Sequence, residues 1–238
     1  MLKKVIADLK RIRTVDWRWL VIWIIIYASF LFLDIFSPDF LGATLIKYTG
    51  IFLCLVYAYQ KFRHDTLLIL ALLFTLLADT ILVWTPYYIP GVYAFVFAQF
   101  FHMARFTKPH PKTLIGFFLI VFVIFAAGVT QGIDPIYVIA FIYASTLLLN
   151  VGLAISWYRQ DKQNFHARCA CYGFILFLAC DLSVAMQYLS SDHVIPAVIF
   201  PVVSYLVWLF YYPSQVLISN SSNVKPIKSK VKLEGLKT

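Results

Sequence analysis

Eight continuous apolar runs, each close to 20 residues long, constrain this chain more than any other feature of its sequence. They fall at residues 17–36, 41–59, 66–85, 88–106, 112–131, 135–157, 168–190 and 194–218. A helix needs about 20 apolar residues to cross the roughly 30 Å hydrocarbon core of a bilayer. Membrane barrels show short alternating segments instead. The sequence therefore predicts an all-α polytopic membrane bundle with eight transmembrane helices.

The composition argues against a water-soluble protein. Hydrophobic residues make up 62% of the 238 residues and charged residues only 13%, whereas charged residues are roughly 25% of a soluble domain. We expect a basic amphipathic N-terminal segment at 1–16, a transmembrane domain at 17–218 and a polar basic tail at 219–238. No small-residue cleavage site follows the first run, so we expect no cleaved signal peptide.

The net charge of +9 is distributed in a way that argues against nucleic-acid binding. Lys and Arg gather in the two terminal segments and after the second, fourth and sixth runs, which all lie on one side of the membrane. The opposite side carries Asp34, Asp39, Asp134 and Asp192. This distribution predicts a multi-pass plasma-membrane protein with both termini in the cytoplasm. The basic ends are expected to contact anionic lipid headgroups. The pattern does not bear on the oligomeric state.

Two aspartates lie inside apolar runs, where an ionisable side chain indicates a functional site. Asp79 lies in FTLLADTILVW and Asp181 in GFILFLACDLSVAM. An Asp at the centre of a spanning helix costs about 2.5–3.5 kcal/mol on the insertion scale. Each lies about 13 residues along a run that starts at the cytoplasmic side, so at 1.5 Å per residue both lie about 20 Å deep.

Two carboxyl groups that share a site of low dielectric are expected to divide the roles of acid and base. Burial favours the protonated form of one group while the other is ionised. Such a pair can carry protons, bind a cation or hydrolyse an acid-labile bond in a lipid, and the residues alone leave these three open. Neither a metal nor another cofactor is expected, because the sequence offers no His/Asp/Glu cluster and Cys169-x-Cys171 lacks nearby partners.

Other polar residues of the runs are candidates to orient a substrate or water. Gln99 and His102 follow Gly91 and Phe95 at helical spacing, so the four can line one helix face. His102 also lies close to the cytoplasmic interface, where water can reach it.

Four further residues complete this set of candidates. Asn150 is a candidate for the site and also for a structural hydrogen bond between helices, and Tyr212 and Gln215 lie in the last run. Lys47 lies near the outer end of the second run. It is expected either to extend outward to the interface or to pair with one of the aspartates.

Four segments carry a resemblance to a known family. TLLAD at 75–79 is similar to an S-x-x-G-D pattern, and GVYAFVFAQFFH at 91–102 is similar to G-x-x-x-F-x-x-x-H-x-x-Y. GFILFLACD at 173–181 is similar to G-x-x-x-F-x-x-S-D, and YPSQ at 212–215 to Y-x-x-Q. Their order and spacing resemble the YhhN family of eight-span membrane proteins, whose characterised members are lysoplasmalogenases.

The resemblance implies hydrolysis of the vinyl ether bond of a lysolipid, with Asp79 and Asp181 as the acid and base. The candidate polar residues would orient substrate or water, and Lys47 would act as a charge partner. Gln99 stands where the pattern has His, and Gln cannot transfer a proton; His102 stands where it has Tyr. The alternative is a non-enzymatic lipid-binding protein or a proton- or cation-coupled carrier on the same scaffold.

Overall fold

The computed structural model describes residues 16–36, 41–107, 111–191 and 196–222, and these residues are helical with short connections. The helices are α2 (Trp17–Phe36), α3 (Leu41–Phe62), α4 (Thr66–Trp84), α5 (Tyr88–Thr107), α6 (Pro111–Thr130), α7 (Pro135–Gln160), α8 (Phe165–Ser191), the 3₁₀ helix η1 (Ala197–Ile199) and α9 (Phe200–Ser219). The predicted all-α fold class is confirmed for this part of the chain. The amphipathic segment at 1–15 and the tail beyond 222 lie outside the described residues.

Six of the described helices are long and apolar enough to cross a membrane: α2, α3, α4, α7, α8 and α9. Within α6, the residues Ile115–Thr130 form a further apolar stretch. Helix α5 has 20 residues, but its second half carries Gln99, His102 and Arg105, which lower its mean hydropathy. The membrane character is thus supported, while the count of eight spans stays a prediction.

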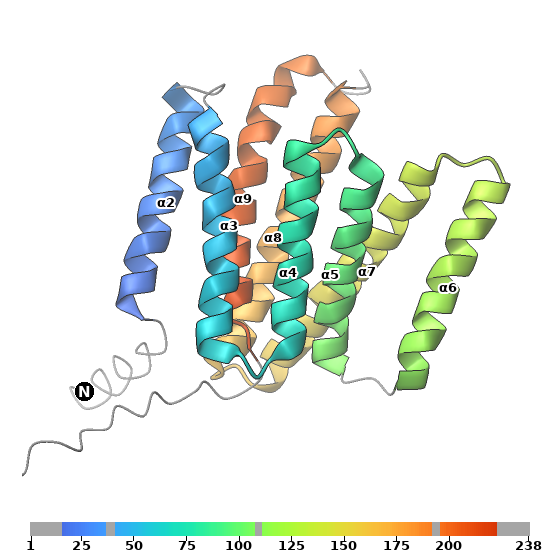
Figure 1. Cartoon of the computed structure of the whole chain (residues 1–238), viewed down its shortest axis with the longest axis horizontal. Helices are drawn as coiled ribbons and strands as arrows, with labels where there is room; N and C mark the ends of the chain where they lie inside the picture. Colours follow the sequence, from blue (N-terminus) through green and yellow to red (C-terminus); the bar gives the residue numbers. More distant parts are fainter. Residues whose placement is uncertain (1–15, 37–40, 108–110, 192–195, 223–238) are drawn as a thin grey trace, which may run out of the picture.

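The helices run up and down, and the short loops make sequence neighbours antiparallel (Figure 1). Two aspartates begin helices by capping them. Asp65 accepts a hydrogen bond from the Leu68 backbone nitrogen of α4 at 3.2 Å, and Asp134 accepts one from Ile136 of α7 at 2.9 Å. Such caps satisfy backbone donors that lack a partner inside the helix. The start of α2 and the end of α9 lie at the same end of the bundle (Figure 1).

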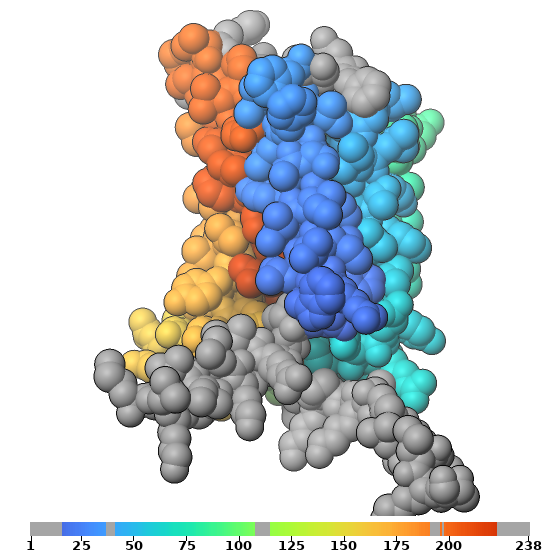
Figure 2. All heavy atoms as spheres, turned by 90° about the vertical axis from the view of Figure 1, so that its left-hand side faces the viewer, coloured from blue at the N-terminus to red at the C-terminus, as the bar shows by residue number. Residues whose placement is uncertain are grey.

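Helices α4, α5, α7, α8 and α9 surround the interior of the bundle, and α2 and α6 lie at its two edges (Figure 1). Figure 2 shows α2 lying over the seam between α3 and α9. At the opposite edge, α6 packs against α7 and meets α5 through aromatic rings, with Phe100 and Phe118 tilted to each other at a centroid distance of 4.4 Å. Most side chains of α2 are exposed, as expected of a helix that faces lipid.

The C-terminal end of α9 continues into a buried segment, Asn220–Ser222, that joins five helices at one end of the bundle. Hydrogen bonds of 2.6–3.0 Å link its polar atoms to Tyr57 of α3, Asp65 at the start of α4, Arg105 of α5 and His166 of α8. Buried polar atoms need such partners, because water cannot replace them there. This segment and its four partners are called the end cluster below.

Gly173 sets the close contact between α8 and α9. A Cβ atom at this position would lie 2.9 Å from Cγ1 and 3.2 Å from the backbone nitrogen of Ile218. We expect Gly173→Ala to push the two helices apart and to lower the free energy of unfolding by about 1–3 kcal/mol. Thermal unfolding of the purified protein in detergent measures this change.

Gly152 of α7 provides the matched control, because a Cβ atom there would meet nothing within 4 Å. Gly152→Ala removes a glycine from a helix. It should leave the free energy of unfolding unchanged or raise it by up to about 1 kcal/mol, so the melting temperature should not fall. Equal losses of stability in both variants would contradict the assignment of Gly173 to a tight helix contact.

Candidate functional site

Helix α4 directs Asp79 into the bundle. The buried residues of α4 are Leu68, Ala71, Leu72, Thr75, Ala78 and Asp79, which follow one another at the three- to four-residue spacing of a single helix face. Asp79 is 7% exposed. The apolar residues that bury this face therefore also bury the carboxyl group.

Tyr211 of α9 is the hydrogen-bond partner of Asp79. Its hydroxyl donates to Oδ2 of Asp79 at 2.6 Å, so the carboxyl group is not left unsatisfied in the interior. The Tyr211 ring packs beside Trp208 at 5.4 Å and Phe177 at 5.7 Å. These rings fix the direction of the phenol, and α4 and α9 are joined at the depth of Asp79.

A second pair of the same kind joins α7 and α8. The Tyr143 hydroxyl donates to Oδ2 of Asp181 at 2.5 Å. Both side chains are half-buried, whereas Asp79 and Tyr211 are buried. The second Tyr–Asp pair therefore reaches the surface of the bundle, and the first lies behind it.

The two Tyr–Asp pairs belong to one site. Cys180 lies close enough to Asp79 and Asp181 to interact electrostatically with both carboxyl groups, and Tyr143 and Tyr211 interact with each other in the same way. The ring of Phe95 lies 5.7 Å from Tyr143 and 6.1 Å from Phe177, which in turn contacts Tyr211. The site thus holds two carboxyl groups and two phenols beside an aromatic wall.

Gln99 and Asn150 are also part of this neighbourhood. Asn150 Nδ2 donates to the Gln99 backbone oxygen at 2.7 Å and to Gln99 Oε1 at 2.9 Å. Both residues are fully buried, and the Gln99 amide interacts with the Tyr143 hydroxyl. Four of the residues that the sequence singled out, Asp79, Gln99, Asn150 and Asp181, are therefore brought together.

The other candidate residues lie elsewhere in the bundle. His102 is buried with its ring edge-on to Phe174 at 5.0 Å, and among the described residues neither ring nitrogen has a hydrogen-bond partner. The Tyr212 ring stacks on Tyr27 of α2 at 5.7 Å. Gln215 is fully buried, and its Nε2 lies 3.4 Å from Ser214 Oγ.

Lys47 forms an ion pair with Asp34, with 2.7 Å between Nζ and Oδ1. Its ammonium group also lies 5.0 Å from the centroid of the Trp208 ring. Of the two expectations for Lys47, pairing is the one observed, but the partner is Asp34 of α2 rather than a central aspartate.

Tyr143 and Tyr211 are the two site residues that the sequence reasoning missed. Tyr143 precedes Asn150 by seven residues, two helical turns, so both lie on one face of α7. Tyr211 is adjacent to Tyr212 in FYYPSQ, and the buried positions of α9 at Tyr211, Gln215 and Ile218 share its face. The helical register was therefore the available signal in both cases.

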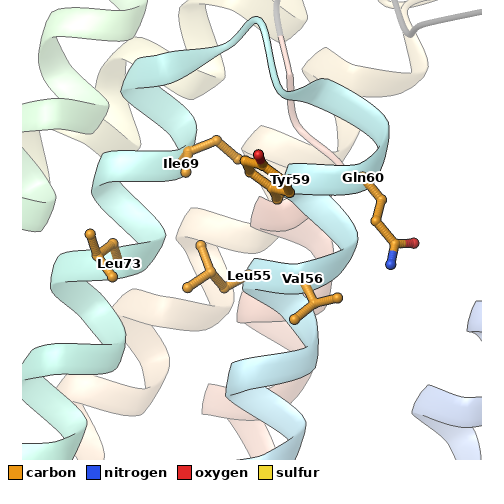
Figure 3. A pocket seen from close by; sticks show the side chains of 6 residues that line it. All are labelled: Leu55, Val56, Tyr59, Gln60, Ile69 and Leu73. Carbon is orange, nitrogen blue, oxygen red and sulfur yellow. The ribbon is translucent and has the colours of Figure 1, made fainter.

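A groove of about 400 Å³ opens between α3 and α4 (Figure 3). It is lined by Leu55, Val56, Tyr59, Gln60, Ile69 and Leu73. None of these residues takes part in the hydrogen bonds around the two aspartates. Among the described residues, no group of three or more His, Cys, Asp or Glu side chains is placed to hold a metal ion, and all four cysteines are buried and free.

Comparison with known proteins gives one match. A model of the YhhN family matches residues 42–222, a range that runs from the start of α3 to the end of the described chain and includes both aspartates. No curated protein and no solved structure shows a significant match.

Tyr211 and Tyr212 offer a matched test of the hydrogen bond to Asp79. Tyr211→Phe removes the only hydrogen bond recorded for the Asp79 carboxyl group within the described residues, and we expect a loss of about 1–2 kcal/mol in the free energy of unfolding. Tyr212→Phe removes a buried hydroxyl that has no hydrogen-bond partner in the described part of the chain, so its melting temperature should be unchanged or higher. Equal melting temperatures for the two variants in detergent would contradict the assignment.

Proposed function

Because this chain belongs to the YhhN family, which includes lysoplasmalogenases, we propose that it is an integral membrane hydrolase of lysoplasmalogen-type lysolipids. The reaction is cleavage of the vinyl ether bond, with Asp79 and Asp181 as the acid and base. The observation that carries the proposal is the pairing of each carboxyl group with a tyrosine, on four different helices, around Cys180.

The first step is proton transfer from a protonated carboxyl group to the β-carbon of the vinyl ether. The π-electrons of the double bond form the new C–H bond, and the adjacent carbon and ether oxygen share the positive charge of an oxocarbenium ion. The second, ionised carboxyl group stabilises this cation electrostatically. Electrostatic stabilisation of this kind is strongest in a site that excludes water, because charges interact strongly there.

Water then attacks the cationic carbon, and the ionised carboxyl group takes its proton. The product is a hemiacetal, in which the former vinyl carbon carries a hydroxyl group and the glycerol ether oxygen. Its collapse breaks the bond to that oxygen, which leaves with a proton. A fatty aldehyde and a glycerophospho-alcohol are released, so the net reaction adds one water molecule.

The surroundings of the two carboxyl groups suit an amphiphilic substrate. The rings of Phe95 and Phe177 lie beside the tyrosines, and an apolar wall of this kind can accommodate an alkenyl chain. The half-buried pair of Asp181 and Tyr143 lies within two helices long enough to span the membrane. We propose that the lipid approaches the site from the membrane, past this pair.

We expect Asp79→Asn and Asp181→Asn each to lower the rate of aldehyde release from lysoplasmalogen by about 10²–10⁴-fold, the usual contribution of a general acid or base. The assay uses purified protein in detergent. Asp134→Asn is the matched control, since Asp134 caps α7 at an exposed position and Asn caps a helix equally well.

Full activity in both site variants would show that the assignment is wrong. Absence of release from well-folded wild-type protein would favour the alternative, a lipid-binding protein or a carrier. A carrier transports its substrate only with an ion or proton gradient, whereas a hydrolase works in detergent without one.

We further propose that the protein lies in the plasma membrane with both ends of the chain in the cytoplasm, in line with the positive-inside rule. A green fluorescent protein fused after Thr238 should then fluoresce, and alkaline phosphatase at the same point should be inactive. The reverse result would invert the proposed orientation.

A further inference from the structure

We propose that Asn150, Gln99 and Tyr143 form a directional chain of polar contacts that ends at Asp181 and holds this carboxyl group ionised, so that Asp79 carries the proton. The inference rests on the proposed function and deepens it, because it assigns Asp79 as the acid and Asp181 as the base. Asn150 and Gln99 are then positioning residues, which act through Tyr143.

The chain starts from an atom whose role is fixed. The backbone oxygen of Gln99 can only accept a hydrogen bond, and an Asn150 side-chain atom lies 2.7 Å from it. That atom must be Nδ2, the donor end of the Asn150 amide. The orientation of Asn150 therefore follows from the backbone of α5.

The orientation of Gln99 follows from that of Asn150. The same Nδ2 lies 2.9 Å from the end of the Gln99 side chain, and a donor requires an acceptor, which is Oε1. The remaining end of the Gln99 amide is the donor Nε2. Within the described residues this atom forms no hydrogen bond of close geometry, and the group with which the Gln99 side chain interacts is the Tyr143 hydroxyl.

The Tyr143 hydroxyl has one proton to donate. Because the Gln99 amide presents a donor to this hydroxyl, the proton points away from Gln99 and toward Oδ2 of Asp181 at 2.5 Å. A hydrogen bond that is held in the donating direction toward a carboxyl group stabilises its ionised form.

Asp79 has no such arrangement around its tyrosine. Tyr211 donates one hydrogen bond to it, as Tyr143 does to Asp181, and the carboxyl group is buried. Within the described residues, however, no second donor to the Tyr211 hydroxyl fixes the direction of its proton. Lys47 is paired with Asp34 and does not neutralise either carboxyl group. Burial in an apolar site favours the protonated form of a carboxyl group, and of the two ions the less stabilised is that of Asp79.

This arrangement gives Gln99 a function at the position where the family pattern has His. The amide cannot move a proton, but it can hold Tyr143 in a fixed direction because Asn150 holds Gln99. In this chain the contacts of Asn150 bridge α7 to α5. The Tyr143 hydroxyl, whose direction is fixed in this way, donates to Asp181 on α8.

Infrared spectroscopy of the purified wild-type protein and its variants in detergent tests the assignment without turnover. A protonated carboxyl group has a carbonyl stretching band that an ionised one lacks. We expect one such intramembrane band in the wild type, its loss in Asp79→Asn and its persistence in Asp181→Asn. Loss in Asp181→Asn alone, persistence in both variants or absence from the wild type would each overturn the proposal.

Asn150→Leu tests the chain itself. We expect a second carboxyl band, from Asp181, and a kcat for aldehyde release that falls by up to about 10²-fold, the effect of misplacing a catalytic group by about 1 Å, with KM unchanged. Thr146→Val is the matched control, since Thr146 is a buried residue one turn away on α7 whose hydroxyl donates to the Tyr143 backbone oxygen. Identical spectra for wild type and Asn150→Leu would overturn the role of the chain.

The two readouts separate the inference from the function on which it rests. A spectrum with the Asp79 band and no hydrolysis of lysoplasmalogen would reject the proposed function and keep the assignment of the proton. Hydrolysis with the band on Asp181 would keep the function and reject the assignment. If Asn150→Leu does not fold, the comparison of Asp79→Asn with Asp181→Asn still decides where the proton lies.

Discussion

The structure depends on one constraint, that a carboxyl group inside an apolar bundle must receive its hydrogen bonds from the protein itself. Water is scarce at that depth, and an unsatisfied polar group there costs several kcal/mol. Tyr211 meets this requirement for Asp79, and Tyr143 meets it for Asp181. Each contact joins two helices, so the same two hydrogen bonds that satisfy the aspartates also fix α4 to α9 and α7 to α8.

The helical fold could be predicted from the sequence because hydrophobic length is a local property. The expected run at 41–59 became α3, which extends to Phe62, and the run at 194–218 became η1 and α9, which starts at Phe200. Pro201 at the first turn of α9 suits a helix start. Such shifts at helix ends arise from capping and turn geometry, which the length of an apolar run does not reveal.

The site could be predicted only in part, because its partners are set by contacts between helices that are distant in sequence. Asp79 and Asp181 stand out from their own segments, but a tyrosine in an apolar run does not. The choice between Tyr211 and Tyr212 depends on a rotation of about 100° around α9, and the partner of Lys47 depends on α2 lying next to α3. These facts come from packing and not from any one segment.

The end cluster has a consequence for the order in which this protein is completed in the cell. Its central segment, Asn220–Ser222, follows the last helix, whereas its partners belong to helices that are synthesised much earlier. The contacts of Tyr57, Asp65 and Arg105 with this segment therefore cannot form until α9 and the residues after it have been synthesised. Quality control that recognises exposed polar groups in the membrane would sense a truncated chain at this point.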